Sequence, residues 1–82
     1  MVLGMMPTMP AKDRTLSKFG LNVARLRAAK GFSQEKLAEK AGIDRTYVSG
    51  IERGVRNPGI KMVLQIAKAL GVSITELCED VS

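Results

Sequence analysis

The residues best suited to chemistry with another molecule lie in one short run, from Asp44 to Arg53. The apolar positions of this run, Val48 and Ile51, are three apart, which is the spacing of one face of a helix. The other face is then polar and points away from the core. Its candidate contact residues are Arg45, Thr46, Tyr47 and Ser49. Such a helix fits the major groove of double-stranded DNA, where each base pair has its own pattern of donors and acceptors.

Each of these four side chains carries a group that can contact the edge of a base. Arg45, at the start of the helix, can donate two hydrogen bonds to O6 and N7 of guanine. Thr46 and Ser49 can contact a thymine methyl group or a base-edge acceptor. Tyr47 offers a ring and a hydroxyl to a base or a phosphate. We therefore expect these four residues to read base sequence.

Residues 33–54 predict two helices joined by a tight turn. The predicted helices cover residues 34–40 and 45–53. Ser33 and Asp44 precede them and are typical N-cap residues. Gly42 lies between them and permits a sharp turn. This arrangement predicts a helix-turn-helix unit whose second helix is presented to DNA.

The expected contacts to the DNA backbone flank the base-reading helix. Gln34 begins the preceding helix, whose free N–H groups and dipole favour a phosphate. Arg53, Arg56 and Asn57 follow the base-reading helix and suit contact with the backbone. Contacts of this kind give an affinity that falls steeply as the salt concentration rises.

The rest of the chain predicts three more helices around an aliphatic core. They cover residues 16–29, 60–69 and 73–79. Ser73 and Glu76 have the spacing of a capping box, and glycines follow several of the helical patterns. No alternating strand pattern is present, so the predicted fold is all-α with five helices. We expect residues 1–14 to form a mobile tail and 15–82 to form one domain.

The last two predicted helices carry more apolar surface than one small core needs. We expect the core-facing stripe to consist of Ile60, Val63, Ala67 and Leu70. The apolar residues left for a partner surface are Met62, Ile66, Ala69, Ile74 and Leu77. A surface of this kind usually marks an interface, so we expect a symmetric homodimer on a palindromic site, with half-sites about one DNA turn apart. The alternative is that Ile66 and Leu77 complete the core.

Composition argues against several other functions. The chain has no His and a single Cys, Cys78, and its acids form no cluster at metal-binding spacing, so we expect no enzymatic activity, metal or cofactor. The net charge of +5 agrees with a polyanionic partner. No apolar run approaches the roughly 20 residues needed to span a bilayer. A lone cysteine is typical of the reducing cytoplasm.

The segment from Phe19 to Leu77 resembles the repressor/Cro-type (XRE-like) helix-turn-helix family. The resemblance is carried by VARLRAAKGFSQEKLAEKAGIDRTYVSGIERGVRNP and IAKALGVSITEL. Within the family, DRTYVSGIERGVRNP is most similar to the controller proteins of restriction–modification systems. Those proteins are small cytoplasmic dimers that bind operator DNA and regulate their own gene and the endonuclease gene.

The resemblance also implies roles for single residues. It places the base-reading set at positions where controllers contact bases or flanking backbone, and it places Gln34, Arg27 and Arg56 near phosphate contacts of the family. Arg27 and Glu52 match a pair that forms a buried ion pair in phage repressors. Gly59 departs from the pattern, because relatives often carry Ser or Thr there as a helix cap.

The partners implied are an operator in double-stranded DNA, a second copy of the chain, and RNA polymerase, which the bound dimer would block or recruit. Two related functions stay open from the sequence. One is a phage-type repressor. The other is an antitoxin-like autorepressor that represses its operon and binds a toxin through a second surface.

Overall fold

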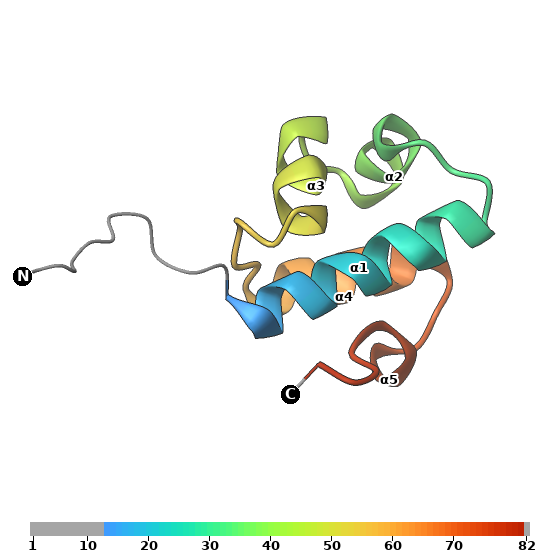
Figure 1. Ribbon diagram of the computed structural model, residues 1–82. Coiled ribbons are helices and arrows are strands. Elements are labelled where there is room, and N and C mark those ends of the chain that lie inside the picture. The colour runs from blue at the N-terminus through green and yellow to red at the C-terminus, as the bar shows by residue number, and fades with distance from the viewer. Residues whose placement is uncertain (1–12, 82) are drawn as a thin grey trace, which may run out of the picture.

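This computed structural model describes residues 13–81. Within that range the chain forms five helices joined by loops, and no strand is found (Figure 1). They are α1 (Arg14–Ala29), α2 (Gln34–Ala41), α3 (Arg45–Glu52), α4 (Ile60–Leu70) and α5 (Ile74–Leu77). The all-α prediction is confirmed. Of the predicted tail, residues 1–12 lie outside the described residues, whereas Asp13 caps α1 and Arg14 begins it. Helix α1 thus begins two residues earlier than the predicted helix, which was expected to start at residue 16.

Local hydrogen bonds explain where four of the five helices begin. In each, the side chain of the N-cap residue accepts a hydrogen bond from a backbone N–H in the first turn. The capping residues are Asp13, Ser33, Asp44 and Ser73. Each such cap stabilises a helix by about 1 kcal/mol. The capping box predicted for Ser73 and Glu76 is present, whereas α4 begins at Gly59 without a side-chain cap.

The turn between α2 and α3 depends on one glycine. Gly42 has a φ of 72°, in the left-handed region, where residues with a side chain are strained. Directly after it, the N–H of Ile43 donates to the carbonyl of Ala38 at 2.9 Å. The two helices therefore follow each other closely and meet at an angle, as predicted.

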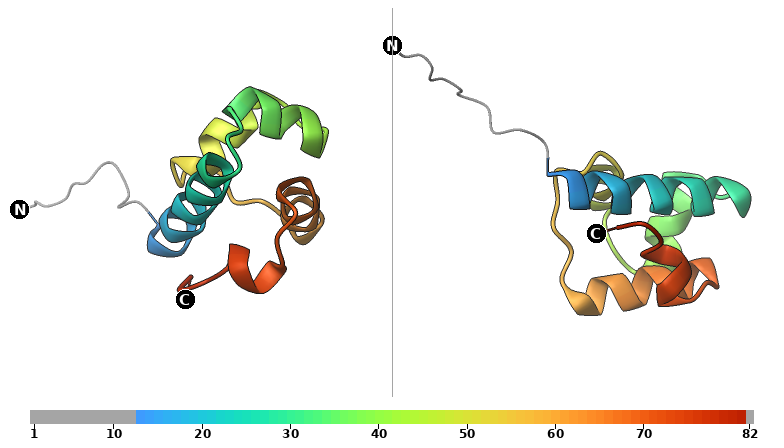
Figure 2. Two further views of the ribbon diagram at one scale, coloured as in Figure 1. Left: turned by 90° about the vertical axis from the view of Figure 1, so that its right-hand side faces the viewer. Right: turned by 60° about the horizontal axis from the view of Figure 1, so that its bottom comes forward.

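α1 lies between two groups of helices (Figures 1 and 2). It packs against α3 on one side and against α5 on the other, while α2 contacts both α3 and α4. Every helix contributes to the core. Its fully buried large side chains are Val23, Leu37, Val48, Ile51, Ile66, Leu70 and Leu77. The core is aliphatic, as the composition predicts.

The core-facing side of α4 differs from the prediction. Ile60, assigned to the core stripe, is 70% exposed, whereas Ile66, assigned to a partner surface, is fully buried. The reason is that α4 packs against two neighbours, α2 and α5. A helix covered from two directions buries a wider arc than one stripe, so residues from both predicted stripes face inward.

The interface prediction is therefore wrong for two residues. Ile66 and Leu77 are both 0% exposed and belong to the core of the chain itself, so they cannot contact a second copy. Met62 and Ala69 are half-buried and pack against that core. Among the predicted interface residues, only Ile74 remains an exposed large side chain. On α4, the exposed large apolar residues are Ile60 and Leu64, which were not predicted at the interface.

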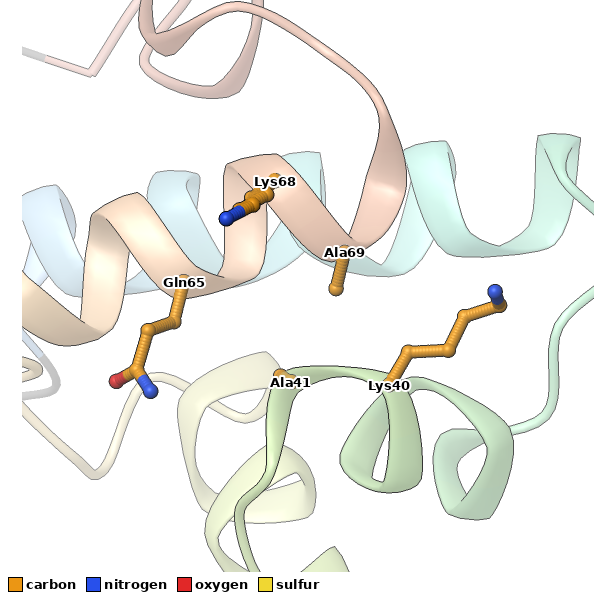
Figure 3. Close-up of a pocket in the computed structure, with 5 residues that line it drawn as sticks. All are labelled: Lys40, Ala41, Gln65, Lys68 and Ala69. Atoms are coloured by element: carbon orange, nitrogen blue, oxygen red, sulfur yellow. The ribbon is translucent and has the colours of Figure 1, made fainter.

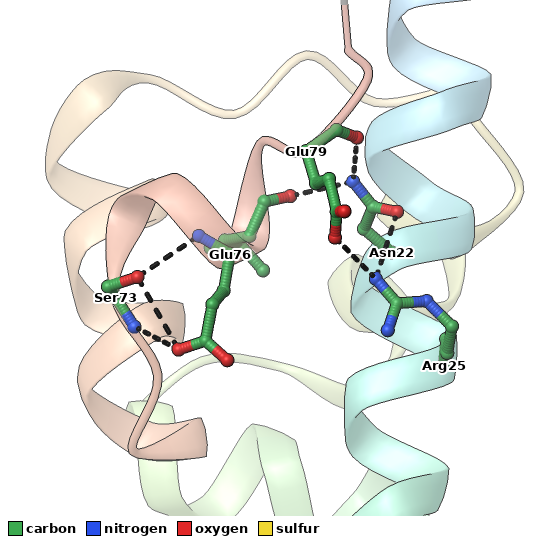
Figure 4. A network of polar contacts seen from close by, with 6 residues as sticks. Asn22, Arg25, Ser73, Glu76 and Glu79 are labelled. Carbon is green, nitrogen blue, oxygen red and sulfur yellow. Dashed lines mark hydrogen bonds and ion pairs between the residues drawn. The ribbon is translucent and has the colours of Figure 1, made fainter.

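A polar contact that the sequence analysis missed holds the short helix α5 in place (Figure 4). The side-chain amide of Asn22, on α1, donates to the carbonyls of Leu77 at 3.0 Å and Glu79 at 2.8 Å. Next to it, Arg25 and Glu79 form an exposed ion pair at 3.8 Å. Asn22 thus ties the end of the domain to α1, although the two segments are far apart in sequence.

We expect Asn22→Ala to destabilise the protein by about 1–2 kcal/mol, because the carbonyl of Leu77 is partly buried and loses its donor. The measurement is urea denaturation followed by circular dichroism. Arg25→Ala is the control, because an exposed ion pair contributes about 0–1 kcal/mol. Equal losses in the two variants would contradict a specific role for Asn22.

Candidate nucleic-acid interface

The outward face of α3 is a row of polar side chains. Val48 and Ile51 are buried, as predicted, and turn the opposite side of the helix to solvent. Arg45, Ser49 and Arg53 are four residues apart and therefore lie along one line on that side. The Nε of Arg53 donates to the hydroxyl of Ser49 at 3.4 Å. Arg53 thus belongs to the same row as the base-reading candidates, rather than lying beyond them.

Thr46 is exposed beside this row, whereas Tyr47 lies at its edge. Tyr47 is half-buried, and its ring packs against the hydrophobic core. The guanidinium of Arg56, from the loop between α3 and α4, lies over the ring with Cζ 5.5 Å from the ring centroid. At this distance the cation is attracted by the electrons of the ring. The structure thus joins Tyr47 and Arg56 into one unit at the edge of the face. Asn57 is exposed in the same loop.

The predicted pair of Arg27 and Glu52 forms a two-pronged ion pair between α1 and α3. The Nε of Arg27 lies 2.6 Å from one carboxylate oxygen of Glu52, and Nη2 lies 3.0 Å from the other. Both side chains are mostly buried, at 19% and 7% exposed. The hydrogen bond to Glu52 raises the pKa of Arg27 and outweighs the opposing effect of burial.

The third guanidinium nitrogen of Arg27, Nη1, donates to the carbonyl of Phe32 at 2.8 Å. All three nitrogens of the group therefore donate to atoms of the protein. This geometry favours the ion pair over the phosphate contact, which was the second role expected for Arg27.

Gln34 extends the ion pair towards the base-reading row. Its Nε2 donates to Glu52 at 2.9 Å, which leaves its Oε1 pointing to Arg45, and Nη1 of Arg45 donates to that oxygen at 3.4 Å. A continuous chain of hydrogen bonds thus runs from α1 through α3 and α2 to the first residue of α3. The chain orders Gln34 and links Arg45 to the interior.

The polar row of α3 is therefore flanked on both sides by ordered side chains from other segments. Gln34, at the start of α2, lies on one side, and Arg56, from the α3–α4 loop, lies on the other. The phosphates of a DNA duplex run along both borders of the major groove, which is about 12 Å wide and admits one helix. The arrangement fits a helix in the groove with a polar or basic group towards each border.

No other described region offers comparable chemistry. Figure 3 shows an open depression between α2 and α4, lined by Lys40, Ala41, Gln65, Lys68 and Ala69. Its two lysines lie in the last turns of their helices, where a cation complements the helix dipole. Within residues 13–81, no group of three His, Cys, Asp or Glu side chains could hold a metal ion. Within the same range, the helices are too short or too polar to cross a membrane.

Comparison with known proteins identifies the family to which this domain belongs. The model of the helix-turn-helix family matches residues 23–77. The chain belongs to the helix-turn-helix family. The two helices of the helix-turn-helix motif are α2 and α3, in that order.

Several similar proteins are controllers of restriction–modification systems. Control protein C.BamHI of Bacillus amyloliquefaciens is 45% identical over 62 residues, which cover 74% of this chain and 76% of that protein. The crystal structure of the controller C.AhdI from Aeromonas hydrophila has 50% identity and a TM-score of 0.74, covering 76% of this chain and 94% of that one.

A third similar protein has been solved with DNA. The restriction–modification controller C.Esp1396I, as a tetramer in complex with its natural 35-base-pair operator, has 41% identity and a TM-score of 0.71. The match covers 82% of this chain and 99% of that one. The predicted resemblance to controller proteins is thereby confirmed.

Two residues that position helices of this domain, Gly20 and Asn22, were not found from the sequence. Gly20 on α1 lies against the backbone carbonyls of Ile51 and Glu52, so closely that a Cβ there would collide with them. Asn22 positions α5. Gly50, which the sequence predicts to let α3 lie close to DNA or to a neighbouring helix, lies beneath the side chain of Arg56. A glycine inside a predicted helix, without a turn residue beside it, was the one sequence signal for Gly20.

We expect Glu52→Ala to lower the free energy of unfolding by about 3–5 kcal/mol, because it leaves the charge of Arg27 mostly buried and unpaired. Thermal and urea denaturation measure the loss. Arg45→Ala is the control within the same chain of hydrogen bonds, and it should cost little because Arg45 is exposed. Replacing both charges, with Arg27→Met and Glu52→Leu, should restore much of the stability. A loss below about 1 kcal/mol in Glu52→Ala would contradict this role of the pair.

Proposed function

We propose that this chain is a controller-type regulator that binds a palindromic operator as a homodimer and thereby controls transcription. The chain is a DNA-binding transcription regulator of the helix-turn-helix family. The observation that carries the proposal is the polar row of α3. Burial of Val48 and Ile51 turns this row outward, and Gln34 and Arg56 border it. The proposal describes a binding protein and includes no enzymatic step.

In this proposal α3 reads bases in the major groove. Arg45 donates to O6 and N7 of a guanine, while Thr46 and Ser49 contact neighbouring base edges or a thymine methyl group. Arg53, in line with Arg45 and Ser49, contacts the backbone or a base near the end of the helix. Tyr47 contacts a base or a phosphate at the edge of the groove. The exposure of Arg45, Thr46 and Arg53 supports these roles.

The same proposal assigns contacts with the DNA backbone to the flanking residues. Gln34 lies at the start of α2, where the helix dipole favours a phosphate. Arg56 and Asn57 would contact the other border of the groove from the α3–α4 loop. Because cations on phosphates release counterions, the logarithm of the binding constant should fall linearly with the logarithm of the salt concentration.

The proposed dimer uses the exposed apolar residues of α4 and α5. Ile60 and Leu64 are 70% and 51% exposed and lie one turn apart on α4, and Ile74 is exposed at the start of α5. They replace Ile66 and Leu77 as the candidates for this surface. The operator complex of C.Esp1396I, which contains a tetramer, supports assembly of more than one copy on DNA. Two symmetry-related α3 helices would then read the two halves of a palindrome.

We further propose that the bound protein acts in the cytoplasm, where it blocks or recruits RNA polymerase according to the occupancy of the operator. The antitoxin alternative requires a second surface for a toxin. No contact or surface among residues 13–81 favours that alternative specifically. Selection of binding sites from random DNA would test the main proposal, since a palindrome with half-sites about one turn apart is expected.

Arg45→Ala should weaken binding to the selected operator by about 1–3 kcal/mol and relax the preference at one base pair. Fluorescence anisotropy with the operator and with single-base variants measures both effects. Arg25→Ala is the matched control, because it removes the same charge from an exposed site that pairs with Glu79 on the α5 side of the molecule. If Arg45→Ala weakened binding equally on every sequence, Arg45 would be a backbone contact and not a base reader.

Leu64→Glu should shift the protein towards monomer and weaken operator binding, because a charge at the centre of an apolar interface is desolvated without a partner. Sedimentation velocity measures the oligomeric state. Leu21→Glu is the control, since Leu21 is also exposed, at 65%, but lies on α1. A dimer that survives Leu64→Glu and dissociates in Leu21→Glu would place the interface on α1.

A further inference from the structure

We infer that Gly50 is a positioning residue. Because Gly50 has no side chain, the stem of Arg56 can pass directly over the backbone of α3, and we call this contact point the seat. The seat holds the guanidinium of Arg56 over Tyr47, at the border of the base-reading face. The consequence for DNA binding depends on the function proposed above, whereas the seat itself is a property of the free protein.

A side chain at Gly50 would force the side chain of Arg56 to move. A Cβ built on Gly50 would lie 2.5 Å from Cγ of Arg56, 3.4 Å from Nε and 3.5 Å from Cδ. The stem of Arg56 therefore runs directly across the backbone of α3. Glycine is disfavoured within a helix, and Gly50 does not have the positive φ that would require glycine. The close passage of Arg56 is thus the structural reason for a glycine at this position.

Backbone hydrogen bonds fix the segment from which Arg56 projects. The N–H of Val55 donates to the carbonyl of Gly50 at 3.0 Å, and the N–H of Gly54 donates to the carbonyl of Ile51 at 3.0 Å. Since Val55 directly precedes Arg56, the side chain begins its path from a point attached to α3. The seat at Gly50 and the ring of Tyr47 then define where its charge lies.

The charge of Arg56 is also free for another molecule. Among residues 13–81, the ion pairs involve Arg25, Arg27 and Lys36, and no carboxylate lies within ion-pair distance of Arg56. Contact with the ring of Tyr47 leaves the guanidinium N–H groups able to donate to phosphate oxygens. Ordering Arg56 before DNA arrives reduces the entropy that is lost on binding. Gly50 thus acts on DNA through Arg56.

The first test uses the free protein. Tyr47 is the single tyrosine of the chain, which has no tryptophan, so tyrosine fluorescence and the ring-current shifts of the Arg56 side-chain protons both report the contact. Gly50→Ala should abolish the ring-current shifts and change the fluorescence as Arg56→Ala does. Gly59→Ala is the matched control, because nothing lies within 4 Å of a Cβ there. Unchanged Arg56 shifts in Gly50→Ala would overturn the inference.

The second test is a double-mutant cycle on operator DNA. Gly50→Ala should weaken binding about tenfold and reduce the slope of log K against log salt by about one, as expected for loss of one phosphate contact. Arg56→Ala should give the same two changes, and the double variant should bind no more weakly than Arg56→Ala alone. Additive losses would show that Gly50 acts independently of Arg56 and would overturn the inference.

Melting temperatures separate this effect from unfolding. If Gly50→Ala alone fails to fold, the double variant decides, because removing the Arg56 side chain makes room for the new methyl group. A folded double variant supports the seat, and an unfolded one overturns it. Failure of the unmodified protein to bind any duplex at low salt would instead refute the proposed function, while leaving the result in the free protein unaffected.

Discussion

The arrangement of the helix-turn-helix depends on the ion pair between Arg27 and Glu52. A purely apolar contact in this place could be as stable, because removing two charges from water is costly. The ion pair instead provides direction. Glu52 has a spare oxygen lone pair that fixes the amide of Gln34, and Gln34 in turn fixes Arg45. A single mostly buried carboxylate therefore sets the positions of α1, α2 and α3 and links their packing to the surface that is presented to DNA.

The proposed DNA surface is composite, although its base-reading part lies on one helix. α3 supplies the row of Arg45, Ser49 and Arg53. Its two borders come from other segments, Gln34 from α2 and Arg56 from the α3–α4 loop, and both are held by contacts within the protein. A surface ordered before binding loses less conformational entropy on the DNA. Its specificity therefore depends on residues that do not themselves read bases.

The two proposed interfaces lie in different parts of the fold. α3 is on one side of α1 and α5 is on the other (Figure 1). α5 has only four residues and would be marginal without tertiary contacts. Burial of Leu77 and the hydrogen bonds from Asn22 hold it against α1. The separation explains how one small domain can offer apolar residues to a second copy while its polar row faces DNA.

Features that depend on near neighbours along the chain could be predicted from the sequence. They are the caps at Ser33, Asp44 and Ser73, the turn at Gly42, and the orientation of α3, since Val48 and Ile51 leave it one way to pack. The ion pair was found through family resemblance and not from spacing. Tertiary structure alone decided the orientation of α4, because periodicity shows which residues share a face but not how much of the helix two neighbours cover. It also decided the contacts of Asn22 and Gly50, whose partners are set by how the chain folds back on itself.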